Sequence, residues 1–296
     1  MGEVLLGCSG WNYPDTADKG GWTGVFYPDK DTKRLRYYSQ FFSTAEMDST
    51  FYDRFYSQMT KGTFIGMSRA TPEKFQFSIK VPETITHVKR LNVNKGATTY
   101  FEEFLDKISP LRTTNKLGAI LFQLPPSFTV NDFKSIEQFL DKLPTADGYE
   151  YAIEFRHPSW ETEGPWEMLR HYNIAAVLTD SPPSENLEFL SDVTITANQS
   201  FIRFHGRNTK DHYWYNYLYS EQELKPWVEK LNQIREQTNI LRIYFNNHYG
   251  GKAVVNAMQF KAMIGHPLSD NETDALEHAK EYLSNRLTTS SSDQPS

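Results

Sequence analysis

The sequence contains a single cysteine, no long apolar run and no excess of basic residues. Because Cys8 is the one cysteine of the sequence, an intramolecular disulfide framework and a cysteine-based zinc site are excluded. No stretch approaches the ~18 consecutive apolar residues of a transmembrane helix. The start, MGEVLLGCSGW, has neither the basic residues nor the apolar run of a signal peptide. The net charge of −6 at pH 7 argues against a globally basic nucleic-acid-binding protein. We therefore expect a cytoplasmic protein that does not contact membranes.

The 296 residues contain eight apolar runs of strand length, separated by segments with helical periodicity. The predicted strands are Val4–Cys8, Thr44–Asp48, Phe75–Lys80, Gly118–Gln123, Tyr151–Phe155, Ile174–Thr179, Phe201–His205 and Leu241–Asn246. The helical segments include Phe101–Ile108, Phe133–Leu143, Trp166–Tyr172 and Glu221–Ile234. Strands that alternate with helices favour a parallel sheet, and eight such units in a chain of this length predict a TIM (β/α)8 barrel.

The barrel is predicted to form a single domain over residues 1–286. No glycine-rich turn follows the first strand, which disfavours a dinucleotide-binding fold, and no Gly/Ser-rich or Pro-rich linker divides the chain. The final segment, Leu287–Ser296 (LTTSSSDQPS), has nothing apolar to bury. We therefore expect residues 287–296 to be a disordered tail.

Polar residues end nearly every predicted strand. In YAIEFRHPSW (Tyr151–Trp160), a buried run turns charged at its C-terminal end, and strand alternation puts Glu154 and Arg156 on one face. Because barrel active sites lie at the C-terminal ends of the strands, these side chains are predicted to share one mouth. The candidate catalytic residues are Glu46, Glu154, Arg156, His157, Arg203 and His205. The candidate substrate-binding residues at the same ends are Trp11, Lys80, His87, Asp180, Asn246 and Asn247. As an alternative, Glu46–Arg203 and Glu154–Arg156 are ion pairs that only support the barrel.

The loops after the seventh and eighth strands, His205–Lys210 and Asn246–Lys252, carry the most specific signal. In barrels these two loops and a helix N-terminus often bind phosphate, because backbone N–H groups and the helix dipole favour an anion. Glycines permit a close backbone approach and basic side chains add charge. The residues predicted to bind the anion are Arg207, Gly250, Gly251 and Lys252. The alternative is that the two glycines only form a tight turn.

Metal and glycosidase chemistry are weaker alternatives. No HExxH or comparable spacing supports a divalent metal, so we expect no cofactor, although carboxylates and histidines at the strand ends are possible ligands. Those ligands would be Glu46, Glu154, Asp180, His205 and His248. A carboxylate pair, Glu46 with Glu154, is the alternative for glycoside hydrolysis.

Nine stretches carry a resemblance to a known family. They are GCSGWNY (7–13), FYP (26–28), EMDSTFY (46–52), FSIKVPETITH (77–87), LFQLPPSF (121–128), EFRHPSW (154–160), TDSP (179–182), RFHGR (203–207) and YFNNHYGG (244–251). On these stretches the chain resembles the YecE-like proteins, domain-of-unknown-function family 72. The resemblance implies a TIM barrel and no settled activity.

Three positions depart from the pattern of that family. Asp48 stands where the pattern EINSTFY has Asn, so a carboxylate at this position is not a family requirement. His248 replaces the Asp of FNND, which weakens a metal site at the eighth strand. An acidic and Gly-rich segment in the first loop, within Asn12–Tyr27, is expected to alter the rim of the barrel.

The leading functional hypothesis is an enzyme that hydrolyses a phosphate-bearing substrate, such as a nucleotide, a nucleic-acid end or a sugar phosphate. In this hypothesis Arg207, Lys252, Gly250 and Gly251 bind the phosphate, and Arg203 and Arg156 neutralise its charge. Glu46 or Glu154 is the general base, and His205 or His157 is the general acid. A carbohydrate hydrolase or isomerase is the first alternative, and a non-catalytic ligand-binding protein is the second.

Overall fold

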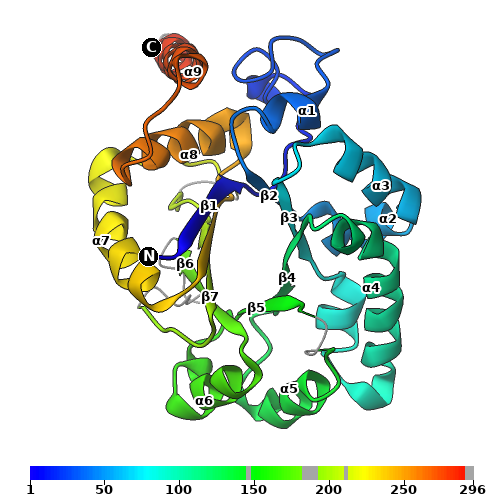
Figure 1. Ribbon diagram of the computed structural model, residues 1–296. Coiled ribbons are helices and arrows are strands. Elements are labelled where there is room, and N and C mark those ends of the chain that lie inside the picture. The colour runs from blue at the N-terminus through cyan, green and yellow to red at the C-terminus, as the bar shows by residue number, and fades with distance from the viewer. Residues whose placement is uncertain (145–147, 182–192, 210–212, 291–296) are drawn as a thin grey trace, which may run out of the picture.

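The computed structural model describes residues 1–144, 148–181, 193–209 and 213–290, and its strands form a ring surrounded by helices (Figure 1). The eight strands pair in parallel, in the order β1-β8-β7-β6-β5-β4-β3-β2. They are β1 (Glu3–Cys8), β2 (Thr44–Met47), β3 (Gln76–Lys80), β4 (Leu117–Gln123), β5 (Glu150–Glu154), β6 (Ala175–Asp180), β7 (Gln199–Phe204) and β8 (Ile240–Phe245). The predicted TIM barrel is confirmed, and the strand bounds differ from the predicted ones by one or two residues.

Helices follow most strands and cover the outside of the ring (Figure 1). They are α1 (Arg34–Tyr38), α2 (Asp53–Tyr56), α3 (Lys61–Ala70), α4 (Ala97–Thr113), α5 (Phe133–Leu140), α6 (Glu163–Tyr172), α7 (Glu221–Gln237), α8 (Lys252–Met263) and α9 (Asp270–Ser290). Short helical turns are η1 (Ala17–Lys19), η2 (Ser49–Phe51), η3 (Thr84–Val88), η4 (Val93–Lys95), η5 (Val130–Asp132), η6 (Pro158–Trp160) and η7 (Tyr249–Gly251). Capping chemistry sets the start of α7, because Ser220 Oγ accepts from Glu223 N and the Glu223 carboxylate accepts from Ser220 N.

The ring closes between β1 and β2 by a side chain rather than by a full ladder. A bridge joins Ser9 to Glu46. Below it, the Tyr38 hydroxyl accepts a hydrogen bond from Cys8 N (2.7 Å) and donates one to the carbonyl oxygen of Thr44 (3.0 Å). Tyr38 is fully buried, so α1 supplies the polar group that satisfies both strand edges at this seam.

Two apolar regions pack on either side of the strands. The larger lies between the strands and the helices. The smaller fills the inside of the ring with Ala119, Leu121, Ala152, Ala175, Val177, Ala197, Phe201 and Tyr244. Towards the N-terminal ends of the strands, the buried Arg242 donates to Gln199, Gln76 and Glu150 and closes the ring from below. The opposite end therefore holds the candidate site.

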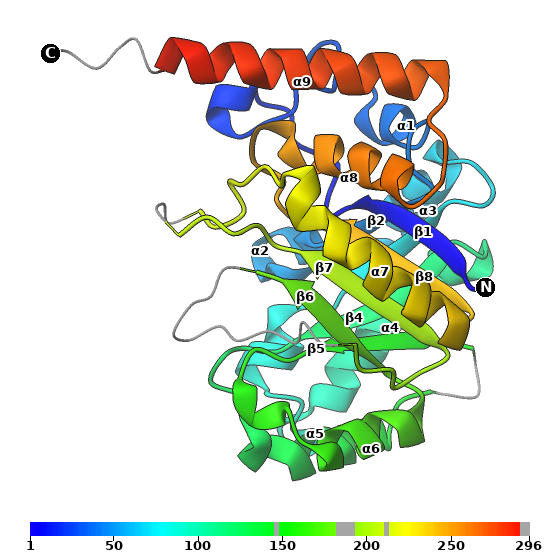
Figure 2. The same cartoon turned by 90° about the vertical axis from the view of Figure 1, so that its left-hand side faces the viewer.

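Helix α9 packs against α8 on the outside of the barrel (Figure 2). It extends to Ser290 and so runs past the boundary at residue 286 that the sequence predicts for the domain. The remainder of the predicted tail, 291–296, lies outside the described residues. None of the helices within the described ranges is long and apolar enough to cross a membrane.

Candidate functional site

A charge network centred on Arg203 occupies the C-terminal end of the ring. Its Nε and Nη2 donate to the two carboxylate oxygens of Glu46 at 2.8 and 2.6 Å. Its Nη1 donates to Glu154 Oε2 at 2.5 Å. The three side chains come from β7, β2 and β5 and are at most 2% exposed. Strand alternation thus brings together three of the side chains predicted to be catalytic.

The second oxygen of Glu154 is also engaged. Oε1 accepts from Arg156 Nε at 2.8 Å and lies 3.5 Å from His205 Nε2. Burial alone would raise the pKa of Glu154, but the Arg203 and Arg156 cations outweigh it and hold that pKa well below its usual range. Glu154 is therefore ionised at neutral pH and is a weak base.

His205 is neutral and orients Glu154. The amide nitrogen of Asn246 contacts His205 Nδ1 at 2.9 Å, and because an amide nitrogen only donates, Nδ1 is the acceptor. The ring proton then lies on Nε2, the atom that faces Glu154. Burial lowers the pKa of His205 to about 4, which agrees with a neutral ring.

Glu46 is also covered. Both of its oxygens accept from Arg203, and its side chain has no exposed surface. Burial raises its pKa despite the neighbouring Arg203. Because Glu46 and Glu154 are both buried and hydrogen-bonded to guanidinium groups, they form a rigid floor beneath the mouth rather than an accessible pair of carboxylates.

Lys80 ends β3 next to this floor and differs from the other charged residues. Its side chain is 7% exposed, and Nζ lies 3.7 Å from the centre of the Phe51 ring. Among the residues that the structure describes, Nζ has no hydrogen-bond or ion-pair partner. Thr50 fixes the arrangement, because its hydroxyl donates to the carbonyl oxygens of Lys80 (2.6 Å) and Met47 (3.0 Å). Burial, together with the Arg203 and Arg156 cations, lowers the pKa of Lys80 to about 7.

A cavity of about 360 Å³ opens where β1 and β2 end. Asp48 lies on its wall, and burial raises the pKa of this carboxyl group. The other lining residues are Gly10, Trp11, Asn12, Tyr13, Met47, Ser49, Tyr52, Phe55 and Met59. We call this space the aromatic cavity. Trp11, predicted to bind substrate, is half-buried here and packs on Phe77 with the ring centres 5.6 Å apart.

Asp180, which was also predicted to bind substrate, organises the seventh loop. Its two carboxylate oxygens accept from Arg207 at 2.7 and 2.5 Å. They also accept from the Tyr219 hydroxyl (2.9 Å) and from Trp227 Nε1 (2.8 Å). Asn247 braces the same loop, with Nδ2 donating to the carbonyl oxygen of Tyr217. The Arg207 cation is thus paired within the protein.

The glycine loop after β8 packs against the first loop of the chain. The Gly250 N–H donates to the carbonyl oxygen of Gly20 (3.1 Å), and the Gly251 N–H donates to that of His248 (3.2 Å). Both glycines have positive φ, and a Cβ at Gly251 would lie 2.6 Å from the Val25 side chain. The first-loop segment therefore covers this turn, and both glycine N–H groups are already bonded.

The remaining predicted residues lie around the mouth. Lys252 Nζ donates to Asn216 Oδ1 at 2.7 Å. His157 caps η6, with its Nδ1 accepting from Ser159 N at 3.1 Å. His87 sits edge-on to the Phe51 ring, 4.9 Å between centres. In the described part of the chain, no three His, Cys, Asp or Glu side chains come together as a metal-binding group.

The aromatic residues that flank Lys80 and Asp48 are not among the site residues predicted from the sequence. Phe51 supports the Lys80 amine, while Tyr52 and Phe55 line the aromatic cavity and are 42% and 44% exposed. The available signal was an aromatic pair directly after the second strand, in EMDSTFY, followed by a third aromatic residue one helical turn later.

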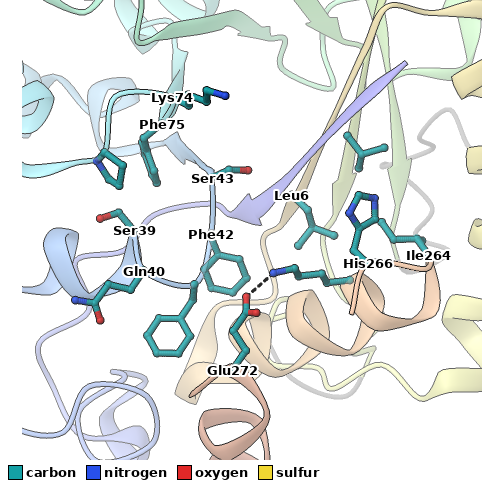
Figure 3. Close-up of a pocket in the computed structure, with 14 residues that line it drawn as sticks. Leu6, Ser39, Gln40, Phe42, Ser43, Lys74, Phe75, Ile264, His266 and Glu272 are labelled. Carbon is teal, nitrogen blue, oxygen red and sulfur yellow. Dashed lines mark hydrogen bonds and ion pairs between the residues drawn. The ribbon is translucent and has the colours of Figure 1, made fainter. Parts of the chain in front are cut away.

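A second cavity, of about 390 Å³, lies at the N-terminal ends of β1, β2 and β3. Figure 3 shows Leu6, Phe42, Phe75 and Glu272 on its wall. Lys261 also lines the cavity and forms an ion pair with Glu272. That pair joins α8 to α9. The cavity is at the opposite end of the strands from the charge network and so lies apart from the candidate site.

Comparisons with known proteins agree with this architecture. A family model described as "Protein of unknown function DUF72" matches residues 5–279. A DUF72 family protein from Thermotoga maritima is 34% identical, with a TM-score of 0.74, over 88% of this chain and 99% of that one. A DUF72 family protein from Enterococcus faecalis V583 is 23% identical, with a TM-score of 0.71, over 90% and 97% of the two chains, and shares the fold. In sequence, the UPF0759 protein YunF of Bacillus subtilis is 27% identical over 88% of this chain and 94% of its own.

Proposed function

Because the chain belongs to the DUF72 family, whose description assigns no activity, we propose from the barrel mouth itself that it is an enzyme that hydrolyses a small phosphate-bearing substrate. The observation that carries the proposal is the Lys80 amine. Lys80 as a residue is 7% exposed, and within the described residues no atom accepts a hydrogen bond from its amine. Burying an amine in this way destabilises a protein, and such groups are concentrated at functional sites.

The charges around Lys80 favour an anion. Glu46 and Glu154 are balanced by Arg203 and Arg156. The remaining carboxyl group near Lys80 is that of Asp48, and burial raises its pKa and so disfavours its negative charge. The Arg156 side chain is 13% exposed and interacts electrostatically with Lys80. A phosphate group between Lys80 and Arg156 would offset the repulsion between these two cations and would keep Lys80 protonated.

Lys80 also suits the chemistry of hydrolysis. A group whose pKa lies near 7 exchanges its proton readily at neutral pH and is an effective general acid or base. In the proposed reaction, the protonated amine binds the phosphate ester and gives its proton to the leaving oxygen, while water attacks phosphorus and the ester P–O bond breaks. Both protons of the attacking water stay with the phosphate, and this dihydrogen phosphate returns one of them to Lys80. Arg203, Glu46 and Glu154 act as the floor that holds Arg156 in place.

The test is calorimetric titration with inorganic phosphate at low salt. We expect the wild type to bind phosphate and Lys80→Met to lose roughly tenfold or more in affinity, because a charge-assisted hydrogen bond contributes about 1.5–3 kcal/mol. Lys107→Met is the matched control, because Lys107 Nζ also lies over an aromatic ring, that of Tyr56 at 3.8 Å, but on α4 outside the barrel. The same titration with a simple phosphate monoester, followed by release of phosphate, tests turnover.

Two results would contradict the proposal. One is a wild type that does not bind phosphate at all. The other is Lys80→Met binding phosphate as well as the Lys107 control does. If Arg207→Ala or Lys252→Ala weakens binding and Lys80→Met does not, the phosphate lies at the seventh and eighth loops instead of at Lys80.

A further inference from the structure

The aromatic cavity is built from two adjoining segments at the barrel mouth. Gly10–Tyr13 follows β1, and Met47–Met59 follows β2 and includes η2 and α2. Tyr52 and Phe55 expose 42% and 44% of their surfaces here. Large aromatic side chains exposed next to a cavity indicate a place where an apolar or planar group binds.

A single carboxylate gives the cavity polarity. Asp48 is half-buried on its wall, between the aromatic residues and the floor of the barrel. Its neighbours include Lys80 and Arg203, which interact with it electrostatically. A ligand in the cavity would therefore place hydrogen-bond donors at Asp48 and an aromatic face at Tyr52.

The cavity and the proposed phosphate position are linked by a short segment of the chain. Thr50 and Phe51 lie between Asp48 and Tyr52 in the chain, and they hold the Lys80 carbonyl oxygen and the Lys80 amine respectively. A ligand that spans both places must carry an anionic group at one end and a planar ring with N–H donors at the other. The volume of about 360 Å³ is in the range of small-molecule sites.

We propose that the aromatic cavity binds the base of a nucleotide whose phosphate lies between Lys80 and Arg156. This inference rests on the proposed function and names its substrate class. A base presents a flat face for Tyr52 and N–H donors for Asp48, whereas a sugar ring supplies no aromatic face for stacking. Guanine carries adjacent ring N–H and amino donors, so guanosine monophosphate is the probe that fits Asp48 best.

The experiment compares guanosine monophosphate, ribose 5-phosphate and guanosine by calorimetry. We expect guanosine monophosphate to bind roughly tenfold or more tightly than ribose 5-phosphate, the scale that stacking of one base on an aromatic residue contributes. Tyr52→Ala should remove that difference and leave ribose 5-phosphate binding unchanged. Asp48→Asn introduces the residue of the family pattern. It should weaken the binding of guanosine monophosphate and leave the binding of ribose 5-phosphate unchanged. Tyr100→Ala is the matched control, because Tyr100 is 46% exposed but lies on α4.

The outcomes separate the two proposals. If ribose 5-phosphate binds and guanosine monophosphate binds no more tightly, the base subsite is wrong while the phosphate site stands. Equal losses for both ligands in Tyr52→Ala would also overturn the subsite. A third outcome is that guanosine binds and Tyr52→Ala weakens its binding, while phosphate and ribose 5-phosphate do not bind. In that case the aromatic cavity does bind a base, and the proposal that the protein hydrolyses a phosphate-bearing substrate is wrong.

Discussion

Replacing Lys80 with methionine is expected to make the protein more stable at neutral pH. Methionine keeps the unbranched apolar stem beside Phe51 and removes the buried amine. The pKa of Lys80 falls from its ordinary value of 10.5 to about 7 in the folded protein, which corresponds to roughly 4–5 kcal/mol of lost stability. At pH 7, half of this group is still protonated, so we expect Lys80→Met to gain up to roughly 4 kcal/mol in free energy of unfolding.

The pH dependence gives the sign of the effect. Between about pH 7 and pH 10.5 the unfolded chain keeps a proton on Lys80 that the folded protein has lost. The stability of the wild type therefore rises with pH in this window, relative to that of Lys80→Met. The advantage of the variant is expected to be largest at pH 7 and to shrink towards pH 10.

Urea unfolding of both proteins at pH 7 and pH 10 measures this difference. Lys116→Met is the control, because Lys116 is also buried, at 5% exposed, but its amine donates to Ser68 and to two oxygens of Thr71. We expect this second substitution to destabilise the protein, since it leaves buried carbonyl groups without a donor. A Lys80→Met protein that is less stable than the wild type at pH 7, or a gain that does not shrink with pH, would refute the reasoning.

Three further outcomes are expected. Glu154→Gln should lower the free energy of unfolding by roughly 3–5 kcal/mol, because it leaves two buried guanidinium groups without their shared carboxylate; a loss below 1 kcal/mol in urea would argue against this. Stability should fall as pH drops from about 6.5 to about 4, because the unfolded chain takes up a proton that folded His205 does not. This contributes roughly 3 kcal/mol, and a His205→Asn variant should reduce the slope of that part of the pH profile, leaving the contributions of His87 and His248, whose pKa values burial also lowers to about 4. Gly7→Ala should lower the melting temperature, since its Cβ would lie 2.0 Å from the Thr44 carbonyl oxygen; an unchanged melting temperature would show that the seam can widen without loss.

The fold and the meeting of charged residues were predictable from local patterns. Apolar runs mark the strands, and the period of two along each strand decides which side chains point into the ring. Glu46, Glu154 and Arg203 all obey that period and lie on the inner face of three strands that are not adjacent in the sheet. The barrel geometry then brings them together at one end.

The hydrogen-bond and ion-pair partners of each side chain were not predictable in the same way. Asp180 binds Trp227 from α7, 47 residues away, and Gly250 binds Gly20 of the first loop. Such contacts depend on how separate loops pack against each other, and neither periodicity nor strand order encodes that. For the same reason the sequence did not distinguish Lys80, which has no described partner, from Arg207, which is paired with Asp180.

The Tyr38 seam has a consequence for how the chain is made. Strand β1 has a continuous ladder with β8. In the described part of the chain, the seam with β2 is held instead by the Ser9–Glu46 bridge, where Gly10 N donates to the Glu46 carbonyl oxygen, and by the hydroxyl of Tyr38. During synthesis on a ribosome, β1 emerges first and β8 last. Strand β1 therefore lacks a full set of backbone hydrogen-bond partners until β8 has been made. Pairing of residues so far apart in the chain is slow, and it leaves an unsatisfied strand edge until synthesis is nearly complete. Nascent chains that end before Ile240 would be the species that most need protection by chaperones.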